Sequence, residues 1–190
     1  SLSRDDCLAR DAADPLAAHR ASFALPEGVI YLDGNSLGAL PRATAARLAQ
    51  VVDSEWGEGL IRSWNAAGWI DAPRRVGAKI AALIGARDDE VICADSTSIN
   101  LFKVLACALR LLRAQPPVAA DARRVILSER GNFPTDLYMA QGLVDLLGAE
   151  HTLMLVEPHE MASTVDALGP RLAVLMLTHV NFQTGAMHDM

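Results

Sequence analysis

Residues 125–156 read VILSERGNFPTDLYMAQGLVDLLGAEHTLMLV and alternate between short apolar runs and one longer segment. The runs Val125–Leu127 and Thr152–Val156 predict strands, while Thr135–Leu147 between them predicts a helix. Both strands are almost wholly apolar, which is typical of a parallel sheet covered by helices on both faces. This stretch therefore indicates an α/β fold.

The same alternation continues on both sides of this stretch. Upstream, Val91–Cys93 predicts a short strand and Asn100–Arg113 a helix with one apolar face. Downstream, Met161–Leu168 predicts a helix and Leu172–Leu177 a near-continuous apolar strand. We expect a three-layer α/β architecture with a parallel-type sheet covered by helices.

The N-terminal part of the chain predicts helices joined by turns. An Asp-Pro pair predicts the start of a helix over Leu16–Phe23, and Gly28–Leu32 predicts a short strand. Pro41 is expected to open a long amphipathic helix. A further helix is expected to start at Pro73 and to end at Gly85.

Composition excludes several classes of protein. The 190 residues are 51% hydrophobic, enough for a substantial core, and the formal net charge is −6 without a basic cluster. We therefore expect no nucleic-acid and no membrane partner. Three widely spaced cysteines, no apolar signal segment and no long apolar run favour a cytoplasmic protein with reduced thiols. The five histidines lack metal-ligand spacing, so no metal site is predicted.

Polar loops follow three of the predicted strands, where ligands bind in parallel sheets. After Cys93, the hydroxyls of Thr97 and Ser98 stand at a helix N-terminus, which suits a phosphate. Ordinary helix capping is the alternative. After Leu127, Phe133 can lie on a planar ligand and Asp136 can hold a ring nitrogen in its cationic form, unless both only staple and cap the next helix.

The third loop begins at Thr178, where the last predicted strand ends. Taken together, a phosphate cradle, a stacking aromatic ring and an acid describe a site for a planar heteroaromatic phosphate. Pyridoxal 5′-phosphate fits better than a dinucleotide, because no Gly-x-Gly-x-x-Gly or Gly-Lys-Ser/Thr loop follows any strand.

Five segments of the sequence resemble kynureninase, a family of pyridoxal-phosphate enzymes with the aspartate-aminotransferase fold. The segments are YLDGNSLGAL at 31–40, SWNAAGW at 63–69, DSTSINL at 95–101, NFPTD at 132–136 and LTHVNFQTG at 177–185. The first and fourth together form a specific pairing, and the resemblance covers essentially the whole chain.

The resemblance implies a role for seven residues. Those that would contact the cofactor are Thr97 and Ser98 at the phosphate, Phe133 on the pyridine ring, Asp136 near its polar edge, and Thr178. Ser36 and Trp64 would lie on the substrate side, with Trp64 offering an aromatic face to the aryl group. For Trp64, packing into the core is the alternative.

The resemblance also implies an activity and an organisation. The reaction is hydrolysis of L-kynurenine to anthranilate and L-alanine, in tryptophan catabolism and NAD biosynthesis, by a cytoplasmic homodimer. Residues 1–72 would form an N-terminal segment with substrate-side loops, and residues 73–190 the first part of the cofactor-binding large domain. The remainder of that domain and a C-terminal small domain would lie outside the chain.

The catalytic lysine of the family has no counterpart among the residues of this chain. Its two lysines, Lys79 and Lys103, both fall inside predicted helices and away from strand ends. The lysine that forms the Schiff base is expected beyond residue 190, so the 190-residue chain alone is predicted to be inactive. Two alternatives remain: a cysteine-desulfurase-like enzyme, in which a histidine usually takes the place of Phe133, and a non-catalytic binding module.

Overall fold

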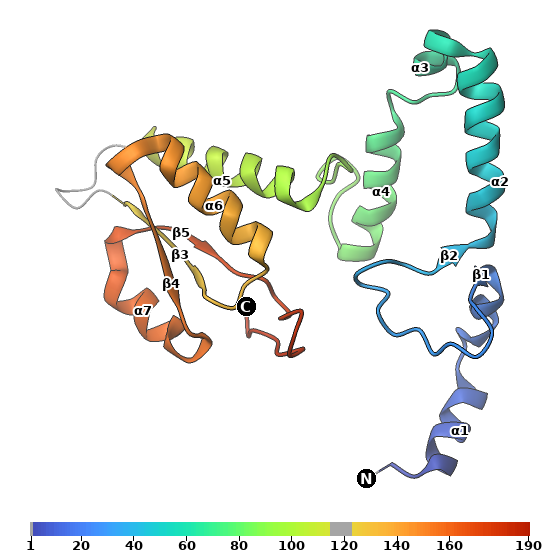
Figure 1. Ribbon diagram of the computed structural model, residues 1–190, viewed down its shortest axis with the longest axis horizontal. Helices are drawn as coiled ribbons and strands as arrows, with labels where there is room; N and C mark the ends of the chain where they lie inside the picture. Colours follow the sequence, from blue (N-terminus) through green and yellow to red (C-terminus); the bar gives the residue numbers. More distant parts are fainter. Residues whose placement is uncertain (1, 115–122) are drawn as a thin grey trace. The chain divides into compact units, whose positions relative to one another are not determined.

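The computed structural model describes residues 2–114 and 123–190, and they form two compact units (Figure 1). The first unit ends at Cys93 and the second begins at Ala94. The predicted division by role between residues 72 and 73 stays a prediction. None of the helices in the described ranges is long and apolar enough to cross a membrane.

A three-stranded parallel sheet forms the centre of the second unit. Its strands are β3 (Val125–Glu129), β4 (Thr152–Val156) and β5 (Leu172–Met176), in the order β4-β3-β5. All three strands were predicted, and β3 is longer than predicted by Ser128 and Glu129. The predicted mixture of helices with a parallel sheet is therefore confirmed.

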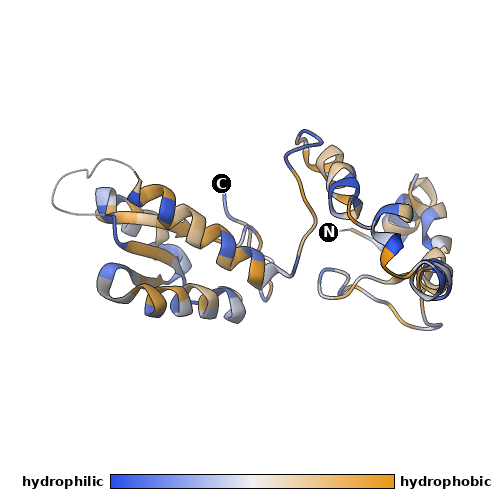
Figure 2. Cartoon of the chain, turned by 90° about the horizontal axis from the view of Figure 1, so that it is seen from above, coloured by the Kyte–Doolittle hydropathy of each residue, from blue (hydrophilic) through white to orange (hydrophobic). Residues whose placement is uncertain are grey.

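Helices cover both faces of this sheet, because side chains alternate along β3. Ile126 lies in a core with Leu105 and Leu109, and Val125 and Leu127 lie in a second core with Met161. The covering helices are α5 (Thr97–Arg113) and α6 (Pro134–Leu147) on the first face and α7 (Met161–Leu168) on the other. Figure 2 shows hydrophobic residues dominating the strands, with both kinds mixed along the helices.

Short 3₁₀ turns and one loop complete the second unit. The turns are η4 (Gly148–Glu150), η5 (Pro158–Glu160) and η6 (Gly169–Arg171). After β5 the chain doubles back on itself, and Val180 pairs with Met187 in an isolated antiparallel bridge. We call residues 179–188 the C-terminal loop.

The first unit is mostly helical. Its elements are α1 (Arg4–Ala13), η1 (Ala17–Ser22), β1 (Phe23–Ala24), β2 (Leu40–Pro41), α2 (Arg42–Gln50), the π-helix η2 (Val51–Glu58), η3 (Leu60–Arg62), α3 (Ser63–Ala66) and α4 (Ala72–Ile84). The long helix after Pro41 and the helix ended by Gly85 confirm two predictions. Gly85 adopts a φ of 73°, a left-handed conformation that glycine permits.

Two predicted strands do not form. Gly28–Leu32 is irregular, and the two-stranded pair is made instead by β1 and β2. Val91–Cys93 runs beside α4, where the Cys93 amide donates to the Pro73 carbonyl at 3.1 Å. Gly77 permits this approach, because a Cβ there would lie 2.1 Å from the Val91 oxygen.

Helix starts differ from prediction for reasons of capping. Helix α5 begins at Thr97 rather than Asn100, because the Ser96 side chain accepts from the Ile99 amide and caps the first turn. The segment predicted as a helix over Leu16–Phe23 forms a 3₁₀ turn. Helix α1 was not predicted; it starts with a capping box between Ser3 and Asp6.

Candidate functional site

The buried side chain of Asn132 connects the ends of β3 and β5. Its Oδ1 accepts hydrogen bonds from the Phe133 amide at 2.7 Å and from the Thr178 hydroxyl at 2.6 Å. Its Nδ2 donates to the Ser128 hydroxyl at 3.1 Å, and Ser128 donates in turn to the Met176 carbonyl at 2.8 Å. Asn132 is 6% exposed and Ser128 fully buried, so water does not compete for these bonds.

Phe133 stands at the N-terminus of α6, directly after this network. Its ring is 44% exposed, and the edge-to-face partner is Phe182 of the C-terminal loop, with ring centroids 5.0 Å apart and planes at 67°. The side-chain Nδ2 of Asn181 donates to the Gly131 carbonyl at 3.4 Å and connects the same loop to the β3–α6 turn. Phe133 is thus held in place while part of its ring stays open.

Asp136 lies in the first turn of α6, three residues after Phe133. Burial raises the pKa of its carboxyl above the ordinary value of 3.8. The N-terminus of a helix favours a negative charge, but here loss of hydration dominates. Within the described residues, the carboxyl makes no hydrogen bond or ion pair, so it is a half-buried acid without a partner.

Thr97 and Ser98 are the first two residues of α5. Thr97 is exposed and Ser98 half-buried, and neither hydroxyl is hydrogen-bonded to any residue that the structure describes. Unpaired backbone N–H groups of the first turn and the helix dipole surround them with positive potential. Helices α5 and α6 both begin on the side of the sheet on which β3 ends (Figure 1).

The predicted cofactor residues thus fall into two groups within the second unit. Phe133 and Thr178 share Asn132 as a hydrogen-bond partner, and Asp136 is held near Phe133 by its amide, which donates to the Phe133 carbonyl at 3.0 Å. Thr97 and Ser98 begin a different helix, and no hydrogen bond among the described residues joins them to Asn132.

The two lysines lie where the sequence predicted them. Lys79 is an exposed residue of α4, and Lys103 is an exposed residue of α5 that pairs with Asp95. Asp95 has a positive φ of 42° and precedes the Ser96 cap. Neither lysine lies at the end of a strand.

Ser36 and Trp64, the predicted substrate-side residues, both belong to the first unit. Ser36 lies in an exposed turn, and the Tyr31 hydroxyl, 2.5 Å from the Leu37 carbonyl, closes the loop around it. Trp64 is 50% exposed, so it is not buried in a core as the alternative would require. Its ring packs edge-on against Trp69, with centroids 6.4 Å apart.

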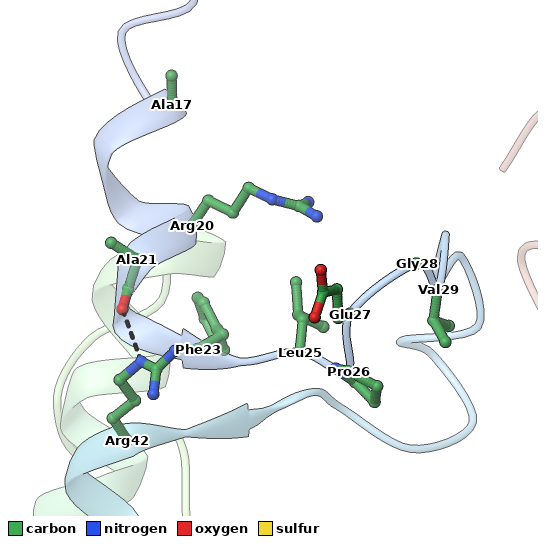
Figure 3. Close-up of a pocket in the computed structure, with 10 residues that line it drawn as sticks. All are labelled: Ala17, Arg20, Ala21, Phe23, Leu25, Pro26, Glu27, Gly28, Val29 and Arg42. Atoms are coloured by element: carbon green, nitrogen blue, oxygen red, sulfur yellow. Dashed lines mark hydrogen bonds between the residues drawn. The ribbon is translucent and has the colours of Figure 1, made fainter.

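The first unit also carries an open pocket beside η1 and β1. Apolar side chains form much of its wall, and Arg20, Glu27 and Arg42 bring charge to it (Figure 3). Arg42 is partly committed, since its Nε donates to the Ala21 carbonyl at 3.0 Å. None of the predicted site residues lines this pocket.

Sequence reasoning missed three residues around the β3 end. Ser128 and Asn132 form the network, and Glu129 is a buried acid, 4% exposed, whose Oε1 lies 3.0 Å from Nε2 of His188. That contact lacks hydrogen-bond geometry, and Glu129 Oε1 has no hydrogen-bond partner in the described part of the chain. A signal for the network was present, because Ser128 is a small polar residue continuing an apolar strand.

No grouping of three or more potential metal ligands occurs among residues 2–114 and 123–190. The site offers instead hydroxyls at a helix N-terminus, a half-exposed aromatic ring, a carboxyl without a partner and a threonine oxygen. These groups suit an anionic, planar, nitrogen-containing ligand.

No protein-family model matches the chain. Curated relatives do: kynureninases of Burkholderia mallei (strain SAVP1) and Pseudomonas fluorescens are each 58% identical to it over 188 and 189 residues, respectively. A kynureninase of Burkholderia pseudomallei (strain 1106a) is also 58% identical, over 188 residues. Each match covers 99% of this chain and 44% of the relative, so the chain spans less than half the length of the relatives it matches. The resemblance to kynureninase is confirmed along the whole chain.

Proposed function

We propose that this chain provides part of a kynureninase, which hydrolyses L-kynurenine to anthranilate and L-alanine with pyridoxal 5′-phosphate as cofactor. The observation that carries the proposal is the similarity to curated kynureninases from one end of the chain to the other. The relatives named above are kynureninases and not desulfurases, which disfavours the cysteine-desulfurase-like alternative. The sheet and helices of the second unit would belong to an aspartate-aminotransferase-like large domain.

The residues present fit the phosphate of this cofactor. Thr97 and Ser98 combine free hydroxyls with the unpaired amides of a 17-residue helix, so a dianionic phosphate would meet donors and a favourable dipole. Bound pyridoxal phosphate supplies an electron sink for charge that develops at the substrate's Cα. The protein groups around it supply binding, orientation and electrostatics.

The ring of the cofactor would lie on Phe133. Its partly open ring offers a stacking surface. The edge contact with Phe182, and the hydrogen bond that the Phe133 backbone N–H donates to Asn132 Oδ1, limit its movement. Asp136 would stand near the polar edge of the ring. There an ionised carboxylate would keep a proton on the pyridine nitrogen, and that cation would lower the pKa that burial now raises.

Thr178 would face the cofactor as a hydrogen-bond acceptor. Its hydroxyl proton is directed at Asn132 Oδ1, 2.6 Å away, which leaves the oxygen lone pairs for another group. The residue thus favours a donor on the ligand. Ser36 and Trp64 would act on the substrate side, with the exposed Trp64 ring facing the aryl group.

The organisation of the enzyme is also part of the proposal. A cytoplasmic homodimer, with residues 1–72 contributing substrate-side loops and residues 73–190 the start of the large domain, agrees with the family resemblance. The catalytic lysine would come from the part of the enzyme that this chain does not match.

A chimera tests the cofactor site. In this chimera the chain replaces the part of the Pseudomonas fluorescens kynureninase that it matches. After gel filtration, the chimera is expected to retain the absorbance of pyridoxal phosphate, and Thr97→Ala is expected to lose most of it at the same cofactor concentration. Thr152→Ala, at an exposed strand position, serves as the control. A folded chimera that retains no cofactor would contradict the proposal.

A further inference from the structure

Glu55 occupies an unusual place in the first unit. It lies in η2, an eight-residue π-helical segment that continues α2. Its carboxylate accepts two short hydrogen bonds. One is donated by the cationic Arg47 Nη1 at 2.5 Å, and the other by the indole Nε1 of Trp69 at 2.6 Å. The side chain is 13% exposed, and π-helical turns are rare and occur frequently at functional sites.

The π-helical winding explains the pairing with Arg47. In a regular α-helix, eight residues make about 2.2 turns, so residues 47 and 55 would be offset by about a fifth of a turn. A π-turn holds more residues, because its hydrogen bonds run over five positions instead of four. The wider turns bring the two side chains into line, and Arg47 then holds one carboxylate oxygen while Trp69 holds the other.

The same π-helical winding leaves the main-chain carbonyl of Glu55 available for a hydrogen bond from a side chain. The Gly59 amide donates to the Ser54 carbonyl at 2.9 Å, five residues back, so it does not occupy the Glu55 carbonyl. The hydroxyl of Ser63, a residue only 3% exposed, donates to that carbonyl at 2.6 Å. Gly59 is required here, since a Cβ would lie 2.1 Å from the Ser63 oxygen. Glu55 therefore anchors the following loop twice.

The loop that Glu55 anchors carries Trp64. The rings of Trp64 and Trp69 meet edge-on at 73°, and the Ile70 amide donates to the Trp64 carbonyl at 3.1 Å. Trp69 is half-buried and held by Glu55, whereas Trp64 remains half exposed. A fixed ring thus supports an accessible one.

We infer that Glu55 is a positioning residue: through Trp69 it fixes the orientation of the Trp64 indole that meets the aryl group of the substrate. The orientation of Trp64 is a property of the first unit alone. Its effect on the substrate rests on the proposed function. Glu55 itself is not expected to touch the substrate.

A spectroscopic experiment on the chain tests the first step. In a Trp56→Phe background, only the two coupled indoles contribute to tryptophan fluorescence and to the tryptophan bands of the near-ultraviolet circular dichroism spectrum. Glu55→Gln, which keeps size but loses the Arg47 ion pair, is expected to weaken the dichroic signal and to shift the emission. Glu58→Gln, three residues later in the same π-helix and exposed, is the matched control and is expected to change neither.

A second variant covers the case in which Glu55→Gln fails to fold. Trp69→Phe keeps an aromatic ring but removes the indole N–H together with the pyrrole ring, so it is expected to change the Trp64 emission in the same direction. Adding Glu55→Gln to it is expected to change the emission little further. If both single variants leave the Trp64 signal unchanged, the positioning role is wrong.

The chimera tests the second step. Glu55→Gln is expected to raise KM for kynurenine several-fold while kcat changes less, whereas Glu58→Gln leaves both as in the parent. An unchanged KM, with an altered Trp64 signal, would overturn the role in substrate orientation. A chimera that binds cofactor but hydrolyses no kynurenine would overturn the proposed function, and the spectroscopic result would still decide the positioning of Trp64.

Discussion

At the scale of single residues, Asn132 makes hydrogen bonds to three residues around the end of β3. It serves Phe133, Thr178 and Ser128 with one buried amide. Asn132→Ala would leave the Phe133 amide and the Thr178 hydroxyl without this acceptor, so the free energy of unfolding is expected to fall by about 1–3 kcal/mol. Urea denaturation measures this, with the exposed Gln183→Ala as the control. A loss equal to that of the control would show that the network contributes nothing.

Asp136 should make the folded chain less stable as the pH rises through the pKa of its carboxyl. Because folding raises its pKa above 3.8, its contribution to stability is present below that value and is lost as pH rises through the higher folded pKa. Asp136→Asn is therefore expected to be more stable than the parent at neutral pH, and the difference should vanish in acid. Thermal unfolding at several pH values checks this, against Asp166→Asn, an exposed site in α7. A difference independent of pH would contradict the account.

His151 should act in the opposite direction. It is 6% exposed, neither ring nitrogen has a partner among the described residues, and burial lowers its pKa below 6.5, helped by the charges of Arg113 and Arg124. Its contribution to stability is therefore present above pH 6.5 and is lost as pH falls toward the lower folded pKa.

Replacement of His151 isolates that contribution. Relative to His151→Leu, the parent is expected to lose stability as the pH falls from about 6.5, in unfolding curves recorded at a series of pH values. His159→Gln, at an exposed position, is expected to follow the parent. Parallel pH profiles for the parent and His151→Leu would show that the ring titrates as in the unfolded chain.

At the scale of the elements, one glycine inside a helix and one directly after the π-helix give opposite expectations. Gly142 lies in α6 with no atom within 4 Å of a Cβ, so Gly142→Ala should stabilise the chain by about 0.5–1 kcal/mol. Gly59→Ala should destabilise it, because the new methyl group would displace the Ser63 hydroxyl from Glu55. Chemical denaturation of both variants checks the pair. An equal change in the free energy of unfolding for both variants would mean that the turn at Gly59 accommodates the methyl group without cost.

Periodicity predicted the elements of the second unit well, because their apolar residues pack into the two cores on either face of the sheet. β4 and α7 have the predicted limits, and α6 and β5 differ by one residue at one end. The failures lie where local contacts override pattern. Val91–Cys93 is apolar enough for a strand, but the Cys93 amide donates to the Pro73 carbonyl of α4 instead of to a strand. Gly28–Leu32 has no neighbouring strand, because β1 and β2 pair with each other.

The residue types of the candidate site could be predicted from the sequence, but the hydrogen bonds that connect them could not. Phe133 and Asp136 follow β3, the hydroxyls of Thr97 and Ser98 begin α5, and both α5 and α6 start on the side of the sheet on which β3 ends. Asn132 could not be assigned its role, since its partner Thr178 is 46 residues away and the link is a tertiary contact. The sequence did not predict the π-helical segment that contains Glu55, nor the hydrogen bond between Glu55 and Trp69.

At the scale of the whole molecule, the residues proposed to contact the cofactor lie in the second unit, and the two proposed for the substrate side lie in the first. Its two lysines are exposed residues of α4 and α5, away from the ends of the strands. We therefore expect the 190-residue chain by itself to hydrolyse no kynurenine. Turnover by the purified chain that disappears in Thr97→Ala would contradict this expectation.

The release of anthranilate from L-kynurenine by the chimera tests the central claim most directly. Anthranilate is fluorescent, so its formation can be followed continuously after addition of pyridoxal phosphate. The account predicts steady turnover by the chimera and its loss in Thr97→Ala, with turnover kept in Thr152→Ala. A folded chimera that contains the cofactor and releases no anthranilate would contradict the assignment of this chain to kynurenine hydrolysis.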